Sequence, residues 1–118
     1  MAAPTAYNRK QGGVYMLVVT TDQIQGKNCE PLGTVRGITV LTRNIGRDIG
    51  SGFKNLVGGE MKAYQELLDN ASRLAQERLV QAAEALGADA VTGMRFTTSS
   101  ITQGGAEVLA YGTAVKFI

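Results

Sequence analysis

The chain has 118 residues, of which 44% are hydrophobic and 19% are charged, with a formal net charge of +2. A chain of this length and composition folds as one globular domain that needs no disulfide or metal to hold its core. The small net charge argues against a surface built for nucleic acid or anionic lipid. With a single cysteine, no intrachain disulfide can form, and nothing indicates an oxidising compartment.

The N-terminal segment, residues 1–13, contains no hydrophobic stretch that resembles a signal peptide. Its proline, asparagine, glutamine and glycine content predicts a flexible tail in front of a single domain, residues 14–118. No apolar run is as long as a membrane span requires. We therefore expect a cytoplasmic protein.

Two strands are predicted in the first part of the domain. Residues 14–20 are rich in strand-forming side chains and are apolar on both faces. The polar stretch 22–28 predicts a loop, and a second strand follows over about residues 32–43. Gly33 and Gly37 interrupt that strand, which indicates a bulge, a bend or another backbone lying close to it.

The middle of the chain predicts a short, weak helix followed by a long one. Apolar residues recur at helical spacing over 44–57, but the glycines among them oppose a stable helix, so packing would have to hold it. Residues 60–86 carry one broad apolar stripe, which predicts a long amphipathic helix. Gly58 and Gly59 precede this helix, and Gly87 stands where a left-handed C-terminal cap is favoured.

Two further strands, residues 90–98 and 107–117, are predicted to form an antiparallel hairpin around a glycine-rich turn at 103–105. In the last strand, apolar residues alternate onto both faces: Val108, Ala110, Gly112 and Ala114 on one, and Leu109, Tyr111, Val115 and Phe117 on the other. One long helix covers only one face of a small sheet, so the other face needs a second cover, such as another subunit. We therefore expect an α+β fold of order β-β-α-α-β-β, with a small antiparallel or mixed sheet.

The sequence offers little catalytic chemistry. It has no histidine, which removes the commonest general base and excludes serine–histidine and cysteine–histidine nucleophiles. The glycines at 50–52 and 57–59 lack the spacing of Walker and dinucleotide-binding loops. Basic and aromatic residues are not interleaved as in single-stranded nucleic-acid sites. We expect no enzymatic activity, no cofactor, and no nucleic-acid or membrane partner.

A few side chains are still candidates for a site. Cys29 alone cannot build a tetrahedral zinc site, so it is either a structural thiol or a weak metal candidate that symmetry gathers around an axis. Asp89, between the long helix and the next strand, is expected to accept backbone N–H bonds. Candidates for subunit salt bridges or for an anion site are Arg36, Arg43, Arg47 and Arg95.

Four segments, in this order, resemble the YbjQ-like family: Arg43-Asn44-Ile45-Gly46-Arg47-Asp48, Leu56-Val57-Gly58-Gly59-Glu60, Ala85-Leu86-Gly87-Ala88-Asp89-Ala90-Val91 and Tyr111-Gly112-Thr113-Ala114-Val115. This is a group of small bacterial and archaeal proteins often labelled "putative heavy-metal-binding". The resemblance covers about residues 14–117. It implies a compact α+β subunit that assembles into a ring, typically a homopentamer, and it implies no established activity. We interpret Gly58, Gly59, Gly87, Asp89 and Gly112 as structural residues of these segments.

Two functions are therefore considered. The first is a homo-oligomeric, pentameric binding or scaffold protein whose partner is itself and whose ligand site lies at subunit interfaces or in a central channel. The alternative is a heavy-metal-binding protein that uses Cys29 or carboxylates at those interfaces. This chain has no Cys-x-x-Cys pair and no histidine, which are the usual ligands for such metals.

Overall fold

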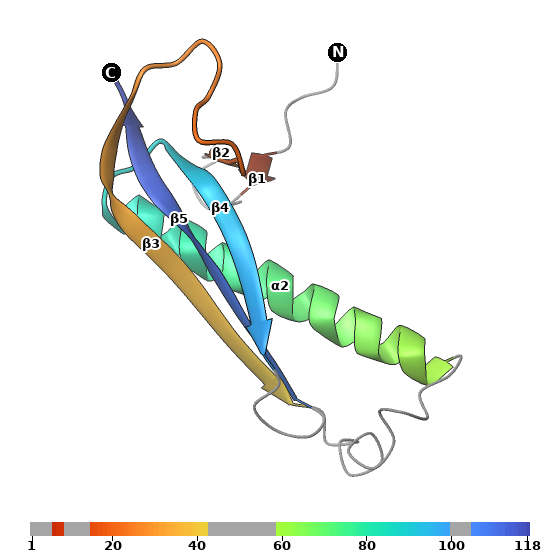
Figure 1. Cartoon of the computed structure of the whole chain (residues 1–118). Helices are drawn as coiled ribbons and strands as arrows, with labels where there is room; N and C mark the ends of the chain where they lie inside the picture. The colour runs from red at the N-terminus through yellow and green to blue at the C-terminus, as the bar shows by residue number, and fades with distance from the viewer. Residues whose placement is uncertain (1–5, 9–14, 43–58, 100–104) are drawn as a thin grey trace.

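The structure is a computed structural model that describes residues 6–8, 15–42, 59–99 and 105–118 (Figure 1). The described elements are β1 (Ala6–Asn8), β2 (Tyr15–Val18), β3 (Cys29–Thr42), α2 (Gly59–Ala85), β4 (Ala90–Ser99) and β5 (Gly105–Phe117). The strands form one five-stranded sheet in the order β1-β2-β4-β5-β3, and α2 lies along one of its faces. The long strand β3 is therefore at an edge of the sheet.

The expected α+β class is confirmed, with a mixed sheet and one long helix. β2 is parallel to β4, whereas the pairs β1–β2, β3–β5 and β4–β5 are antiparallel. The last two strands thus form the predicted antiparallel pair. Of the turn predicted at 103–105, Gly105 begins β5 and the other two residues lie outside the described part of the chain. The predicted short helix at 44–57 lies outside it as well.

β1 lies inside the segment for which the sequence predicts a flexible tail. It pairs with β2 from Ala6 opposite Leu17 to Asn8 opposite Tyr15. The structure therefore has a short strand within the segment that the sequence predicts to be a flexible tail. A strand of three residues is too short to produce the periodic pattern on which sequence-based prediction depends.

α2 approaches the sheet most closely at Gly37 of β3. A Cβ atom at this position would overlap the carbonyl oxygen of Ala75 and the amide nitrogen of Leu79, and would lie 2.9 Å from the Cβ atom of Arg78. Ala75 and Leu79 are hydrogen-bonding partners in an α-helix, so Gly37 lies directly against the helix backbone. Of the alternatives that the sequence leaves open at Gly37, a bulge, a bend or a close backbone, the structure shows a close backbone.

The core lies between α2 and the face of the sheet that contacts α2 at Gly37. Its residues with no exposed surface include Ala71, Ala75, Leu79, Val80 and Ala83 of α2 and Val91, Val108, Ala110 and Ala114 of the strands. Only the middle of the predicted helix stripe is buried in this way. Met61 and Leu86, near the ends of the stripe, are 43% and 48% exposed. α2 does not have the long apolar stretch that a membrane-crossing helix requires.

α2 ends in a Schellman motif. Gly87 has a positive φ of 76°, which a glycine adopts without steric penalty. Its amide donates to the carbonyl of Glu84 at 2.9 Å, and the amide of Ala88 donates to the carbonyl of Ala83 at 3.1 Å. These two bonds satisfy the last helical carbonyls and direct the chain into β4. The predicted C-terminal cap is confirmed.

We expect Gly37→Ala to lower the free energy of unfolding by about 2–3 kcal/mol or more, because the new methyl group presses on backbone atoms that cannot rotate away. Gly87→Ala is the control, since a Cβ atom there meets nothing within 4 Å and adds only left-handed strain of about 1–2 kcal/mol. Urea unfolding followed by circular dichroism measures both losses. A smaller loss for Gly37→Ala than for Gly87→Ala would contradict the close contact.

Candidate functional site

The second face of the sheet has no helix over it among the described residues, and we call it the open face. Residues paired across antiparallel strands point to the same side of a sheet. The open face carries Thr34, Arg36, Ile38 and Val40 of β3, Glu107, Leu109, Tyr111 and Thr113 of β5, and Thr92, Arg95, Thr97 and Ser99 of β4. In Figure 1 the strands pass in front of α2, so this face is turned toward the viewer.

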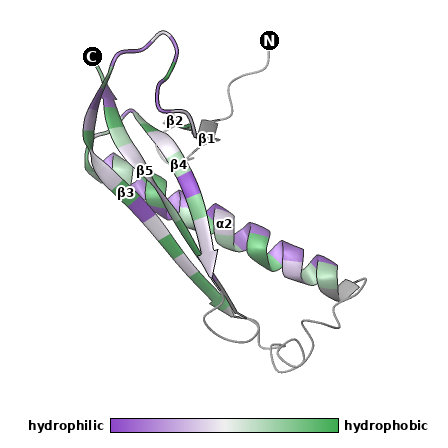
Figure 2. Ribbon diagram, in the orientation of Figure 1, coloured by the Kyte–Doolittle hydropathy of each residue, from purple (hydrophilic) through white to green (hydrophobic). Residues whose placement is uncertain are grey.

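Part of the open face is apolar and exposed. Ile38, Val40 and Tyr111 are 46%, 48% and 45% exposed, and Ile38 pairs with half-buried Leu109. Figure 2 shows hydrophobic residues on β3 as well as on α2. Neighbouring exposed apolar side chains of this kind are typical of a surface that another molecule covers.

One row of side chains across the open face is cationic. Tyr111 of β5 pairs with Arg36 of β3 on one side and with Arg95 of β4 on the other. The two arginines therefore flank the tyrosine on the same face of the sheet, and both are exposed. Among the residues that the structure describes, no carboxylate forms an ion pair with either arginine.

A β-bulge brings Arg95 into this row. The register of β4 against β5 shifts between Thr92 and Arg95, and Gly93 within this bulge has a positive φ of 61°. A left-handed glycine of this type inserts one residue and changes which face the following residues occupy. Met94 is 7% exposed and belongs to the core cluster, whereas Arg95 lies on the open face. Nη1 of Arg95 donates to the carbonyls of Thr20 at 2.8 Å and Met94 at 3.0 Å, which fixes part of the side chain.

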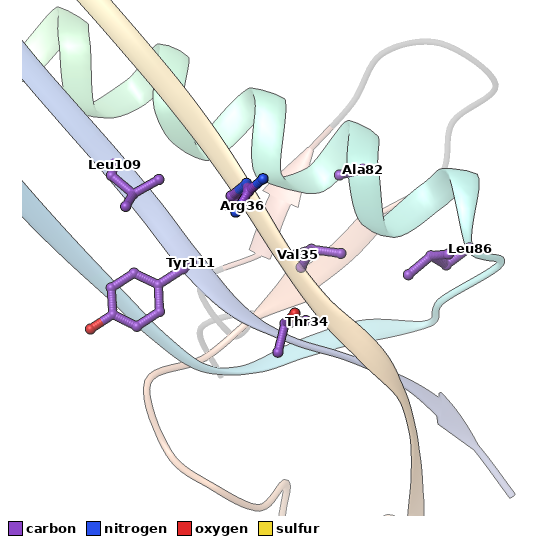
Figure 3. Close-up of a pocket in the computed structure, with 7 residues that line it drawn as sticks. All are labelled: Thr34, Val35, Arg36, Ala82, Leu86, Leu109 and Tyr111. Carbon is purple, nitrogen blue, oxygen red and sulfur yellow. The ribbon is translucent and has the colours of Figure 1, made fainter.

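A hollow of about 740 Å³ lies along the free edge of β3 (Figure 3). Thr34, Arg36, Leu109 and Tyr111 line it from the open face, and Val35, Ala82 and Leu86 line it from the helix side. Arg78 of α2 donates to the carbonyl of Ile38 at 2.6 Å and so occupies one acceptor of the β3 backbone. The hollow thus combines a guanidinium and hydroxyl groups with apolar walls, which is a composition typical of ligand sites.

Cys29 lies elsewhere, in a hollow of about 720 Å³ below the loop that joins β2 to β3. The thiol is free and half-buried, and Asp22 also lines this hollow. The described residues contain no group of three cysteine, histidine or carboxylate side chains able to hold a metal ion. Within the described part of one subunit, the residues around Cys29 therefore do not fit a heavy-metal centre, which needs three or four such ligands.

Asp89 fastens the start of β4 to the end of β5. Its Oδ2 atom accepts a hydrogen bond from the amide of Phe117 at 2.8 Å, and Nζ of Lys116 lies 3.8 Å from the same oxygen. The amide of Asp89 donates to the carbonyl of Val115 at 2.8 Å. The structure thus places Asp89 in a structural contact, away from the cationic row.

The other residues singled out from the sequence are also at packing positions or outside the described part. A Cβ atom at Gly112 would lie 2.8 Å from Cγ1 of Val91, so glycine lets β5 pack against β4. Gly59 begins α2. Gly58, Arg43 and Arg47 lie outside the described residues.

Sequence reasoning names Arg36 and Arg95 as anion candidates but does not place Tyr111 between them. The missing step is the bulge at Gly93, which determines the face that Arg95 occupies. The glycine inside a predicted strand is a signal for a bulge. It does not say how the register continues beyond the bulge.

The isolated position of Cys29 leads to a prediction for metal binding. We expect calorimetric titration with zinc or copper ions to give the same result for the protein and for Cys29→Ser, because a single thiol supplies one of the ligands that such metals require. Micromolar binding that is present in the parent and lost in Cys29→Ser would contradict this expectation. It would show that several subunits bring their thiols together.

Comparison with known proteins identifies the family. The YbjQ family model, described as "Putative heavy-metal-binding", matches residues 16–118. A UPF0145 protein from Halorubrum lacusprofundi is 57% identical to the chain, and the match covers 86% of the chain and 98% of that protein. A UPF0145 protein from Clostridium novyi is 50% identical, and the match covers 87% of the chain and all of that protein. A crystal structure of a protein with unknown function from Pediococcus pentosaceus, assigned to the DUF74 family, shares the fold with a TM-score of 0.64 and 18% identity, covering 87% of this chain and 98% of its own. The chain belongs to the YbjQ, or UPF0145, family.

Proposed function

We propose that the protein is a homo-oligomeric binding or scaffold protein in which subunits cover one another's open faces. The observation that carries the proposal is the exposed apolar surface formed by Ile38, Val40 and Tyr111 beside the free edge of β3. Any ligand would be held at the interfaces or in a central channel. The assembly is a ring, and the family resemblance favours a homopentamer.

A ring needs two different surfaces that fit each other, because head-to-tail contacts join unlike patches of neighbouring subunits. The open face is one such surface. The exposed ends of the α2 stripe, Met61 and Leu86, offer a second apolar surface on the same subunit. The free edge of β3 supports the same proposal, since exposed edge strands pair readily with another chain.

The proposal includes a cytoplasmic location and no enzymatic activity. Its chemical basis is the composition of the chain, which has no histidine and one cysteine. The side chains on the open face are arginine, tyrosine, threonine and aliphatic residues in the main. These groups bind and orient a ligand more readily than they transfer protons near neutral pH.

Heavy-metal binding is the second candidate, favoured by the description of the family and by the position of Cys29 in a hollow with Asp22. It requires that symmetry bring these side chains from several subunits within bonding distance of one ion. A ring with Cys29 near its axis would meet that requirement. The comparison of the parent with Cys29→Ser separates this candidate from the scaffold.

We expect size-exclusion chromatography with light scattering to give a mass several times that of the 12.5 kDa subunit. Ile38→Asp should reduce that mass, because it would place a carboxylate in an apolar interface that excludes water. Asn70→Asp adds the same charge at an exposed position of α2 and should leave the mass unchanged. A monomeric parent at micromolar concentration would overturn the proposal, and so would an Ile38→Asp variant that keeps the full mass.

A further inference from the structure

We propose that Arg36, Tyr111 and Arg95 form a binding site for a small organic anion that carries a phosphate or carboxylate group. The inference rests on the proposed function in one respect, since it names the ligand class of that binding protein. The three residues lie on adjacent strands of a single subunit. All three residues of the site therefore come from one subunit, and the site does not require assembly.

Both arginines have donors free for a ligand. A guanidinium carries five N–H groups and no acceptor, in a planar arrangement that matches carboxylate and phosphate oxygens. The hydrogen bonds of Arg95 to Thr20 and Met94 both use Nη1, which leaves Nη2 and Nε. Arg36 has no hydrogen bond or ion pair to another described residue. Tyr111, which lies between the two arginines in the row, adds a hydroxyl donor.

The spacing of the row puts both arginines within reach of one organic anion. Neighbouring strands are about 4.8 Å apart, so the Cα atoms of Arg36 and Arg95 are separated by about 10 Å across β5. The Arg36 side chain is long enough to lean over Tyr111, which provides an aromatic surface on which a guanidinium stacks. Arg95 is held on the β2 side of β4 by the carbonyl of Thr20 and adds its charge from there. The row therefore places one positively charged residue on each side of Tyr111.

The surroundings do not neutralise these charges. Glu107 is the described carboxylate further along the open face, about 13 Å from Tyr111 at four residues along the strand. It accepts a hydrogen bond of 2.5 Å from the hydroxyl of Ser99. Asp22 approaches from the end of the row near Gly93, but it forms no ion pair with Arg95. An anion can therefore interact with an excess of positive charge.

The walls of the adjoining hollow indicate that the ligand also has an apolar part. Leu109 and Tyr111 border the hollow on the open face, and Val35 and Leu86 border it on the helix side. Figure 3 shows Tyr111, Leu109 and Arg36 around the same stretch of β3. Inorganic phosphate would use the charged row alone, whereas a phosphate or carboxylate on a ring would also contact these walls.

The test is an NMR titration of the full chain with inorganic phosphate, phenyl phosphate and benzoate. We expect amide shifts centred on Arg36 and Tyr111, with an aromatic anion binding more tightly than inorganic phosphate. Arg36→Gln should weaken binding about tenfold or more, because it removes charge-assisted hydrogen bonds. Arg73→Gln is the matched control: it removes the same charge from an exposed α2 arginine that pairs with Asp69, and should leave the affinity unchanged.

The possible outcomes separate this site from the proposed assembly. No binding of any of the three anions to the parent at millimolar concentration would overturn the site, and so would equal weakening in the two arginine variants. The difference between phenyl phosphate and benzoate tells whether phosphate or carboxylate is preferred. Light scattering on the same samples reports the assembly independently: a monomer that binds the anions would overturn the ring but support the site.

Discussion

The rest of the structure depends on the backbone contact between α2 and Gly37 of β3. A side chain at this position would collide with the helix backbone. The helix can therefore lie this close to the sheet only because residue 37 is a glycine. The small residues Ala71 and Ala75 on the facing side of α2 are fully buried at the same interface. Short side chains on both surfaces let the backbones approach, and close packing of this kind fixes one position of the helix.

The same contact determines what the other face of the sheet presents. Side chains alternate along a strand, so seating Gly37 and Val35 against α2 turns Arg36 and Ile38 to the open face. The position of Gly37 against α2 thus determines that both Ile38 and Arg36 lie on the open face. The bulge at Gly93 then sets the face of Arg95. The proposed interface and the proposed anion site would be parts of one surface that share Tyr111.

Much of this architecture can be predicted from sequence, because it depends on local signals. The α2 stripe and the cap at Gly87 come from spacing and from the special conformation of glycine, and the structure has both. The exposed ends of the stripe could not be predicted, since periodicity shows which side of a helix is apolar but not how far the sheet extends beneath it. Met61 and Leu86 are exposed because the sheet does not extend beneath them.

The candidate site was less predictable than the fold. Arg36 and Arg95 are far apart in the chain, and only the register of two strand pairs and a bulge brings them to either side of Tyr111. Pairing registers of this kind are long-range properties that a single sequence does not display. Likewise, the sequence singles out Cys29 because it is the sole cysteine, but the structure places no set of metal ligands around it in the described part of the chain.

The central claim is that one face of the sheet is covered by its own helix and the other by further copies of the chain. Thiol labelling in a Cys29→Ser background tests it most directly. The two variants to compare are Ile38→Cys on the open face and Phe96→Cys on the helix side. These two side chains are 46% and 43% exposed in one subunit, so they should react alike in a monomer. The account predicts that maleimide modifies the Ile38→Cys thiol more slowly than the Phe96→Cys thiol, and that dilution to the monomer removes the difference. Equal rates at every protein concentration would contradict it.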